Sequence, residues 1–96
     1  MITHKFLNTK MKNIFTNVFL GRKIKVINSC DISKIGINGI IINETKNMFQ
    51  IKDLKDNMKN IPKKECIFDI EINNNFERID GKNICYNLAE RIKKFS

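Results

Sequence analysis

The side chains that could carry out covalent or acid–base chemistry are few and lie far apart in the sequence. The only histidine, His4, lies near the N-terminus, and no cysteine is close to it. The three cysteines, Cys30, Cys66 and Cys85, are widely spaced and form no C-x-x-C pair. An odd number of cysteines at such spacings favours reduced thiols in a cytoplasmic protein over a disulfide framework or a zinc ribbon. We therefore expect no catalytic nucleophile and no bound cofactor in this chain.

The best candidates for metal ligands in the sequence are two acidic residues in the segment CIFDIEI. Asp69 and Glu71 alternate with apolar residues, so both point to the same face of a strand. They could chelate a divalent cation, but acids at this spacing are more typical of a solvated face. The sequence also contains no glycine-rich phosphate loop, nucleotide-binding fingerprint or histidine metal box. We expect no metal site and no catalytic residue.

Basic side chains dominate the remaining polar residues. The 96 residues include 18 lysines and arginines against 10 acids, which gives a net charge of +8. The excess lies at the two ends, because residues 1–30 contain six basic residues and no acid, whereas residues 31–80 are nearly balanced. Such a distribution favours RNA as a partner, although any single lysine can equally be a solvated surface charge. The candidate RNA-binding residues are Arg22, Lys23, Lys25, Lys34, Lys46, Lys63, Lys64, Lys82, Arg91, Lys93 and Lys94.

The aromatic residues indicate what kind of RNA is recognised. They are mostly phenylalanines at apolar positions, which gives little support for platforms that stack bases. We therefore expect recognition of structured RNA through its shape and backbone.

Short apolar segments separated by turn residues predict a small all-β barrel or sandwich. In RKIKVI, Ile24 and Val26 alternate with Lys23 and Lys25, which predicts a strand with one apolar and one cationic face. The segment GINGIIINE is apolar at both parities and predicts a strand buried on both faces. Six strands are expected, at residues 22–27, 36–44, 48–52, 58–61, 66–72 and 76–79.

Helical patterns flank these strands. Residues 10–20 place apolar side chains at helical spacing, and Asn87 followed by Glu90 resembles a capping box in front of LAERIKKFS. We divide the chain into a basic N-terminal arm, residues 1–12, and one domain, residues 13–96. No apolar run reaches the roughly 18 residues that span a bilayer. No signal peptide pattern follows the basic N-terminus, so we expect a cytoplasmic protein with no membrane partner.

The order of these motifs resembles archaeal ribonuclease P protein component 1, a family of Sm-like subunits of the enzyme that matures the 5′ ends of transfer RNA. The resemblance rests on GRKIKVINSCDISKIGINGIIINETKN, IPKKECIFDIEI, IDGKNI and ERIKK, in that order, and covers residues 13–94. It implies a mainly β fold: a small Sm-like or SH3-like six-stranded antiparallel barrel with short N- and C-terminal helices. It also implies that this chain has no catalytic residues, because in the family cleavage belongs to the RNA subunit and its magnesium ions.

The resemblance also implies partners, namely ribonuclease P RNA, precursor tRNA, a zinc-binding protein subunit and the other ribonuclease P proteins. In the family, the zinc-binding subunit is bound by the second strand and both terminal segments, here residues 39–43, 13–20 and 88–95. The candidate partner-binding residues are Ile14, Phe15, Val18, Phe19, Ile41, Asn43, Leu88 and Ile92. The chain departs from the family at Asn73-Asn74-Asn75, where a turn glycine is usual, and at Asn87-Leu88, where Arg-Pro is usual.

Other classes of function stay open at this stage. A ribosomal or transcription-associated barrel of the same shape would bind ribosomal RNA or a polymerase. A protein-only adaptor would bind its partner with little salt sensitivity and would ignore RNA. An independent nuclease would depend on His4.

Overall fold

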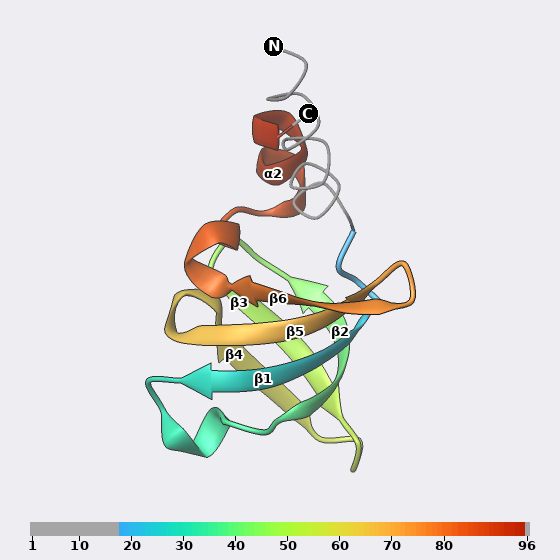
Figure 1. Ribbon diagram of the computed structural model, residues 1–96, viewed down its shortest axis with the longest axis vertical. Coiled ribbons are helices and arrows are strands. Elements are labelled where there is room, and N and C mark those ends of the chain that lie inside the picture. The colour runs from blue at the N-terminus through green and yellow to red at the C-terminus, as the bar shows by residue number, and fades with distance from the viewer. Residues whose placement is uncertain (1–17, 96) are drawn as a thin grey trace.

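The computed structural model describes residues 18–95, which form one curled antiparallel sheet with short helices at its turns (Figure 1). The strands are β1 (Lys23–Ser29), β2 (Asn38–Glu44), β3 (Met48–Asp53), β4 (Met58–Pro62), β5 (Cys66–Ile72) and β6 (Asn75–Asp80). The helices are the 3-10 helices η1 (Ile32–Lys34), η2 (Lys63–Glu65) and η3 (Gly81–Ile84) and the α-helix α2 (Leu88–Phe95). The prediction of a mainly β chain with six antiparallel strands is therefore confirmed.

The six strands of the expected Sm-like or SH3-like barrel form one curled sheet whose two edges do not pair with each other. Its strand order is β4-β3-β2-β1-β5-β6, so β4 and β6 form the two edges within the described part of the chain. β4 is short and ends at Pro62, which has no N–H to offer to a further strand. The sheet therefore curls around its core without pairing its two edges.

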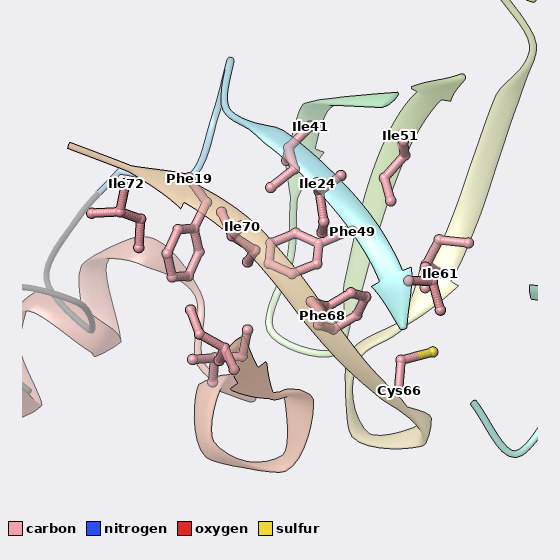
Figure 2. Close-up of a cluster of buried hydrophobic side chains, with 13 residues drawn as sticks. Phe19, Ile24, Ile41, Phe49, Ile51, Ile61, Cys66, Phe68, Ile70 and Ile72 are labelled. Atoms are coloured by element: carbon pink, nitrogen blue, oxygen red, sulfur yellow. The ribbon is translucent and has the colours of Figure 1, made fainter. Parts of the chain in front are cut away.

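The core is built by strand alternation, as the sequence predicts. Ile24 and Val26 are fully buried between exposed lysines on β1, and β5 buries every second residue from Cys66 to Ile72. Three phenylalanines meet edge to face at its centre (Figure 2), with ring centroids 5.8 Å apart for Phe19 and Phe49 and 5.4 Å apart for Phe49 and Phe68. Each fully buried aromatic or aliphatic side chain contributes about 1.5–3 kcal/mol. These contacts hold the strands that carry the surface lysines.

β2 is buried on only one face, so the expectation of a strand buried on both faces is wrong. Ile41 is fully buried, whereas Ile40 and Ile42 are 44% and 39% exposed. No second layer of the described chain covers the outer face of the sheet at this point. β2 therefore has two apolar faces, one in the core and one exposed.

One turn and one close approach between strands depend on residues that the sequence singles out. Asn73 and Asn74 both have positive φ, at 52° and 67°, in the tight connection between β5 and β6. Asparagine tolerates this conformation better than most residues, so it replaces the usual turn glycine. Gly39 lies so close to the backbone of Lys52 on β3 that a side chain at this position would clash with its carbonyl oxygen.

The C-terminal helix begins at the predicted capping box. The Asn87 side chain accepts a hydrogen bond from the Glu90 N–H at 2.8 Å, and the Glu90 carboxylate accepts one from the Asn87 N–H at 3.3 Å. α2 then extends away from one end of the sheet (Figure 1). The helix expected at residues 10–20 falls mainly outside the described residues, and residues 18–20 are not helical. Within residues 18–95, no helix is both long enough and apolar enough to cross a bilayer.

Candidate nucleic-acid interface

The outer face of β1 carries two of the predicted RNA-binding lysines. Lys23 and Lys25 are exposed because the residues between and after them point into the core. Lys25 lies opposite Asp69 on β5, and the Asp69 carboxylate receives two hydrogen bonds from Arg78 on β6, at 3.0 and 3.2 Å. These hydrogen bonds, together with the charge of Asp69, raise the pKa of Arg78. Asp69 is thus paired with Arg78. Asp69 and Glu71 share the outer face of β5, as the alternation predicts, but both are half-buried.

Lys63 does not belong to this surface, so its assignment as an RNA-binding residue is wrong. Its side chain is fully buried, and its Nζ donates hydrogen bonds to Glu44 Oε2 at 2.7 Å, to the Thr45 carbonyl at 2.7 Å and to the Tyr86 carbonyl at 3.0 Å. The ammonium group also lies 4.8 Å from the centre of the Phe49 ring, within the range of a cation–π interaction. A lysine that uses all three donors inside the protein has none to offer to a phosphate.

The buried lysine brings three distant parts of the chain together. Glu44 and Thr45 lie at the β2–β3 turn, Lys63 begins η2, and Tyr86 precedes α2. Gly81, the first residue of η3, approaches the Lys63 carbonyl so closely that a β-carbon there would clash with it. As a result η2 and η3 pack against each other, and the exposed Lys64 and Lys82 line the same cavity.

Lys64 and Lys82 flank a small cavity, which we call the β1–η2 pocket. Its volume is about 220 Å³, and the other residues that line it are Asn28, Ser29, Cys30, Glu65, Cys66, Ile67 and Asp80. It forms where β1 ends beside the start of β5 and the end of β6. Figure 1 shows these strand ends at the left of the sheet. A β-bulge between Val26 and Asn28 shifts the register just before this point. The two cations are balanced by Glu65 and Asp80, so the lining has no net charge.

The strand register defines the floor of the β1–η2 pocket. Ile67 on β5 pairs with Asn28 on one side and with Asp80 on the other. The three side chains therefore form one row across β1, β5 and β6, with an apolar residue between two polar ones. Since neighbouring strands are about 4.8 Å apart, the backbones of Asn28 and Asp80 are about 10 Å apart.

Hydrogen bonds within the pocket orient its polar groups. Asn28 Oδ1 accepts a bond from the Ser29 N–H at 2.9 Å, a bond that does not use the amide nitrogen of Asn28. Asp80 Oδ1 accepts a bond from the Lys82 N–H at 3.0 Å and caps η3. Ser29 Oγ accepts a bond from the Cys66 thiol at 3.3 Å. Burial raises the pKa of that thiol, so Cys66 is a neutral part of the wall.

The other candidate RNA-binding residues are spread over the molecule. Lys46 is exposed in the β2–β3 turn, and Lys34 is half-buried in η1. The Nε of Arg22 donates a hydrogen bond to the Val18 carbonyl at 3.1 Å. Lys93 is exposed on α2, which also contains Arg91 and Lys94. Of all the candidates, the fold brings Lys64 and Lys82 into one pocket and Lys23 and Lys25 onto one strand face.

The candidate partner-binding residues divide between core and surface. Phe19 and Ile41 are fully buried in the hydrophobic core, so their assignment to a partner surface is wrong. Val18 and Asn43 are exposed, and Leu88 and Ile92 lie on α2 and are partly exposed. Ile14 and Phe15 lie outside the described residues.

Sequence reasoning singled out Lys64 and Lys82 but missed the other residues that line the β1–η2 pocket, and it missed the exposed apolar pair on β2, Ile40 and Ile42. Asn28 and Ser29 are separated from Asp80 by half of the chain, and only the register of three strands brings them together. The exposure of Ile40 and Ile42 could have been predicted. Successive residues of a strand point to opposite faces, so isoleucines at consecutive positions cannot all lie in a single core. Among residues 18–95, no group of three or more histidines, cysteines and acids is arranged to hold a metal ion.

Comparison with known proteins identifies the family. Residues 12–94 match the family model described as ribonuclease P/MRP, subunit p29. Over 84 residues the chain is 40% identical to ribonuclease P protein component 1 of Methanosphaera stadtmanae, covering 86% of this chain and 89% of that protein. It is 32% identical over 93 residues to the Pyrococcus abyssi protein of the same name, covering 96% of this chain and 71% of that protein.

The eukaryotic relatives and one solved structure agree with this match. The chain is 40% identical over 76 residues to ribonuclease P protein subunit p29 of Rattus norvegicus, and it spans about a third (34%) of that longer protein. In fold it is similar to Mth11, which is described as a homologue of human RNase P protein Rpp29, with a TM-score of 0.55 and 22% identity over 81% of this chain and 96% of that one. Since the family model and two archaeal relatives match most of the sequence, this chain belongs to the ribonuclease P/MRP subunit p29 family.

Proposed function

We propose that this chain is a non-catalytic, RNA-binding protein subunit of ribonuclease P, the ribonucleoprotein that cleaves precursor tRNA to produce mature 5′ ends. The observation that carries the proposal is the match of residues 12–94 to the p29 subunit family. In this proposal the RNA subunit and its magnesium ions cleave the substrate. The protein stabilises the specificity region of that RNA, and it acts in the cytoplasm.

The charge of the chain supports an electrostatic mechanism. A net charge of +8 favours a polyanionic partner, and exposed lysines on β1, η2 and η3 are placed to neutralise phosphates. Each phosphate that is neutralised releases counterions and reduces the repulsion that opposes compact RNA folding. The protein therefore lowers the magnesium concentration that the RNA needs in order to fold and to bind precursor tRNA.

The exposed apolar face of β2 supports a protein partner as well. Ile40 and Ile42 are exposed on a part of β2 that no described segment covers, and Asn43, the next residue along the strand, is exposed as well. Apolar surface with a polar rim is typical of protein–protein contacts. We propose that the zinc-binding ribonuclease P subunit docks here, and that Leu88 and Ile92 on α2 extend the contact. Ile42→Lys should abolish this binding with little loss of stability, since Ile42 is outside the core.

Reconstitution tests the proposal directly. Ribonuclease P RNA and the other protein subunits are assayed for 5′ cleavage of precursor tRNA at limiting magnesium, with and without this chain. We expect faster cleavage when the chain is added, a smaller gain when magnesium is saturating, and no cleavage by the chain alone.

One control variant and one refuting outcome complete the design. The Ile42→Lys variant separates the protein contact from the RNA contact, because it should bind RNA normally and fail to recruit the zinc-binding subunit. A folded chain that gives no gain at any magnesium concentration would overturn the proposal and would leave ribosomal RNA as the next partner to test.

A further inference from the structure

The β1–η2 pocket has a chemistry that differs from the rest of the basic surface. Its lining combines two lysines with two acids, so it offers no net positive charge to a bare phosphate. It offers instead an apolar floor, Ile67, between a hydrogen-bond donor, the Asn28 amide, and an acceptor, the Asp80 carboxylate. A planar heterocycle with polar edges matches this arrangement, because its face can lie on Ile67 while its edges meet the two polar side chains.

We propose that the β1–η2 pocket binds one unpaired nucleotide of an RNA, and that it prefers a base with an amino group. The base lies over Ile67, its amino edge donates to Asp80, and its acceptor edge receives a bond from Asn28. The attached phosphates lie against Lys64 and Lys82 at the rim. This inference rests on the proposed RNA-binding function and deepens it by assigning base recognition to a site that the basic residues alone do not reveal.

The dimensions of the pocket fit a single base. Its volume is about 220 Å³, and the backbones of its two polar walls lie about 10 Å apart, which leaves room for one aromatic ring system between the side chains. A paired base presents its face to its stacked neighbours, so only a bulged or looped nucleotide can enter. The pocket thereby favours an irregular feature within a structured RNA over a uniform duplex.

The hydrogen bonds that are already formed determine which base is preferred. Asp80 Oδ1 accepts a bond from the Lys82 N–H, which limits the rotation of the carboxylate, and Asp80 lines the pocket. Carboxylates accept bonds from exocyclic amines such as those of cytosine and guanine. Guanine presents two adjacent donors to such a group, whereas uracil has no amino group. We expect guanosine to bind best and uridine to bind worst.

The test uses the full chain and RNA hairpins that differ at one position. The hairpins carry a bulged guanosine, a bulged uridine, a bulged abasic nucleotide or no bulge. Asp80→Asn is the informative variant, because asparagine keeps an oxygen to cap η3 but loses the charged acceptor. Asp53→Asn is the matched control, because Asp53 holds the β3–β4 turn in the same way, with bonds from the Lys55 and Asn57 N–H groups, and lies outside the pocket.

A thiol in the pocket wall gives a second and independent measurement. Cys30 is exposed and lines the β1–η2 pocket, whereas Cys66 is buried. In a Cys85→Ser background, alkylation by N-ethylmaleimide therefore reports on Cys30. An occupied pocket should protect Cys30 from alkylation. This measurement does not depend on whether the Asp80→Asn variant folds.

The expected result is that the guanosine hairpin binds about tenfold more tightly than the uridine and abasic hairpins, and that Asp80→Asn removes this difference whereas Asp53→Asn keeps it. The guanosine hairpin should also slow alkylation of Cys30 more than the unbulged hairpin does. Equal affinities for all hairpins, or equal alkylation with and without the bulge, would overturn the pocket assignment while leaving RNA binding intact. Failure of every RNA, including ribonuclease P RNA, to bind would instead overturn the proposed function itself.

Discussion

Lys63→Met should destabilise the protein more than any substitution of a surface lysine. The wild-type ammonium group is fully buried against a Glu44 carboxylate whose side chain is only 3% exposed, and it donates to two further carbonyl groups. Methionine fills a similar volume but leaves the Glu44 charge and the Thr45 and Tyr86 carbonyls without this donor. Removing one partner of a buried ion pair typically costs about 3–5 kcal/mol.

That magnitude is large compared with the stability of a domain of this size. Small domains unfold at a cost of about 5–15 kcal/mol, so the Lys63→Met variant should lose a large part of its stability. For 60–100 residues, 1 kcal/mol corresponds to a shift of about 4–8 °C in melting temperature, so we expect a decrease of at least about 12 °C.

The assay is equilibrium unfolding in urea followed by far-UV circular dichroism, because the chain has no tryptophan and a single tyrosine. Lys64→Met is the matched control: the same change on the next residue, which is exposed, should alter the free energy of unfolding by less than about 0.5 kcal/mol. Lys63→Met combined with Glu44→Met should recover part of the loss, because no buried charge is then left alone. Equal stabilities of the Lys63→Met and Lys64→Met variants would refute the buried network.

Three further predictions concern the surface, the packing and the pH dependence of the fold. Replacing both Lys23 and Lys25 with alanine should reduce the slope of log affinity for RNA against log salt concentration by roughly one to two, measured by titration at several salt concentrations; an unchanged slope would remove these lysines from the interface. Gly39→Ala should destabilise the fold by about 1–3 kcal/mol in urea unfolding, since its β-carbon would clash with a carbonyl of β3. Hydrogen bonds from Ser33 and from the Asn57 backbone lower the pKa values of Asp31 and Asp53, respectively, below an ordinary 3.8. As pH falls, both carboxylates bind protons in the unfolded chain before they do in the folded one. The stability that they contribute is therefore complete above pH 3.8 and is lost as pH falls through the lowered pKa values of the folded state. The Asp53→Asn variant lacks one of these carboxylates, so its free energy of unfolding, measured in urea at several pH values, should fall less steeply in acid.

Local sequence patterns determined the elements of this protein. Alternation on the first and fifth strands, the asparagine turn at residues 73 and 74, and the capping box of Asn87 and Glu90 all appear in the structure as the sequence predicts. Each of these depends on interactions between residues that are at most a few positions apart. The order of the motifs was also sufficient to indicate the family, which the comparisons confirm.

Tertiary structure decided which face each residue occupies. Lys63 and Lys64 are adjacent and chemically identical, yet one is buried against Glu44 and the other flanks the β1–η2 pocket, because η2 turns one side chain inward. In the same way, Ile41 lies in the core and Ile40 remains exposed, because the sheet has only one covered face at β2. The sequence by itself determined the strands, the turns and the positive charge. The pairing of distant strands decided where that charge is exposed. Burial and the β1–η2 pocket both depend on contacts between residues far apart in the chain, which local sequence patterns do not reveal.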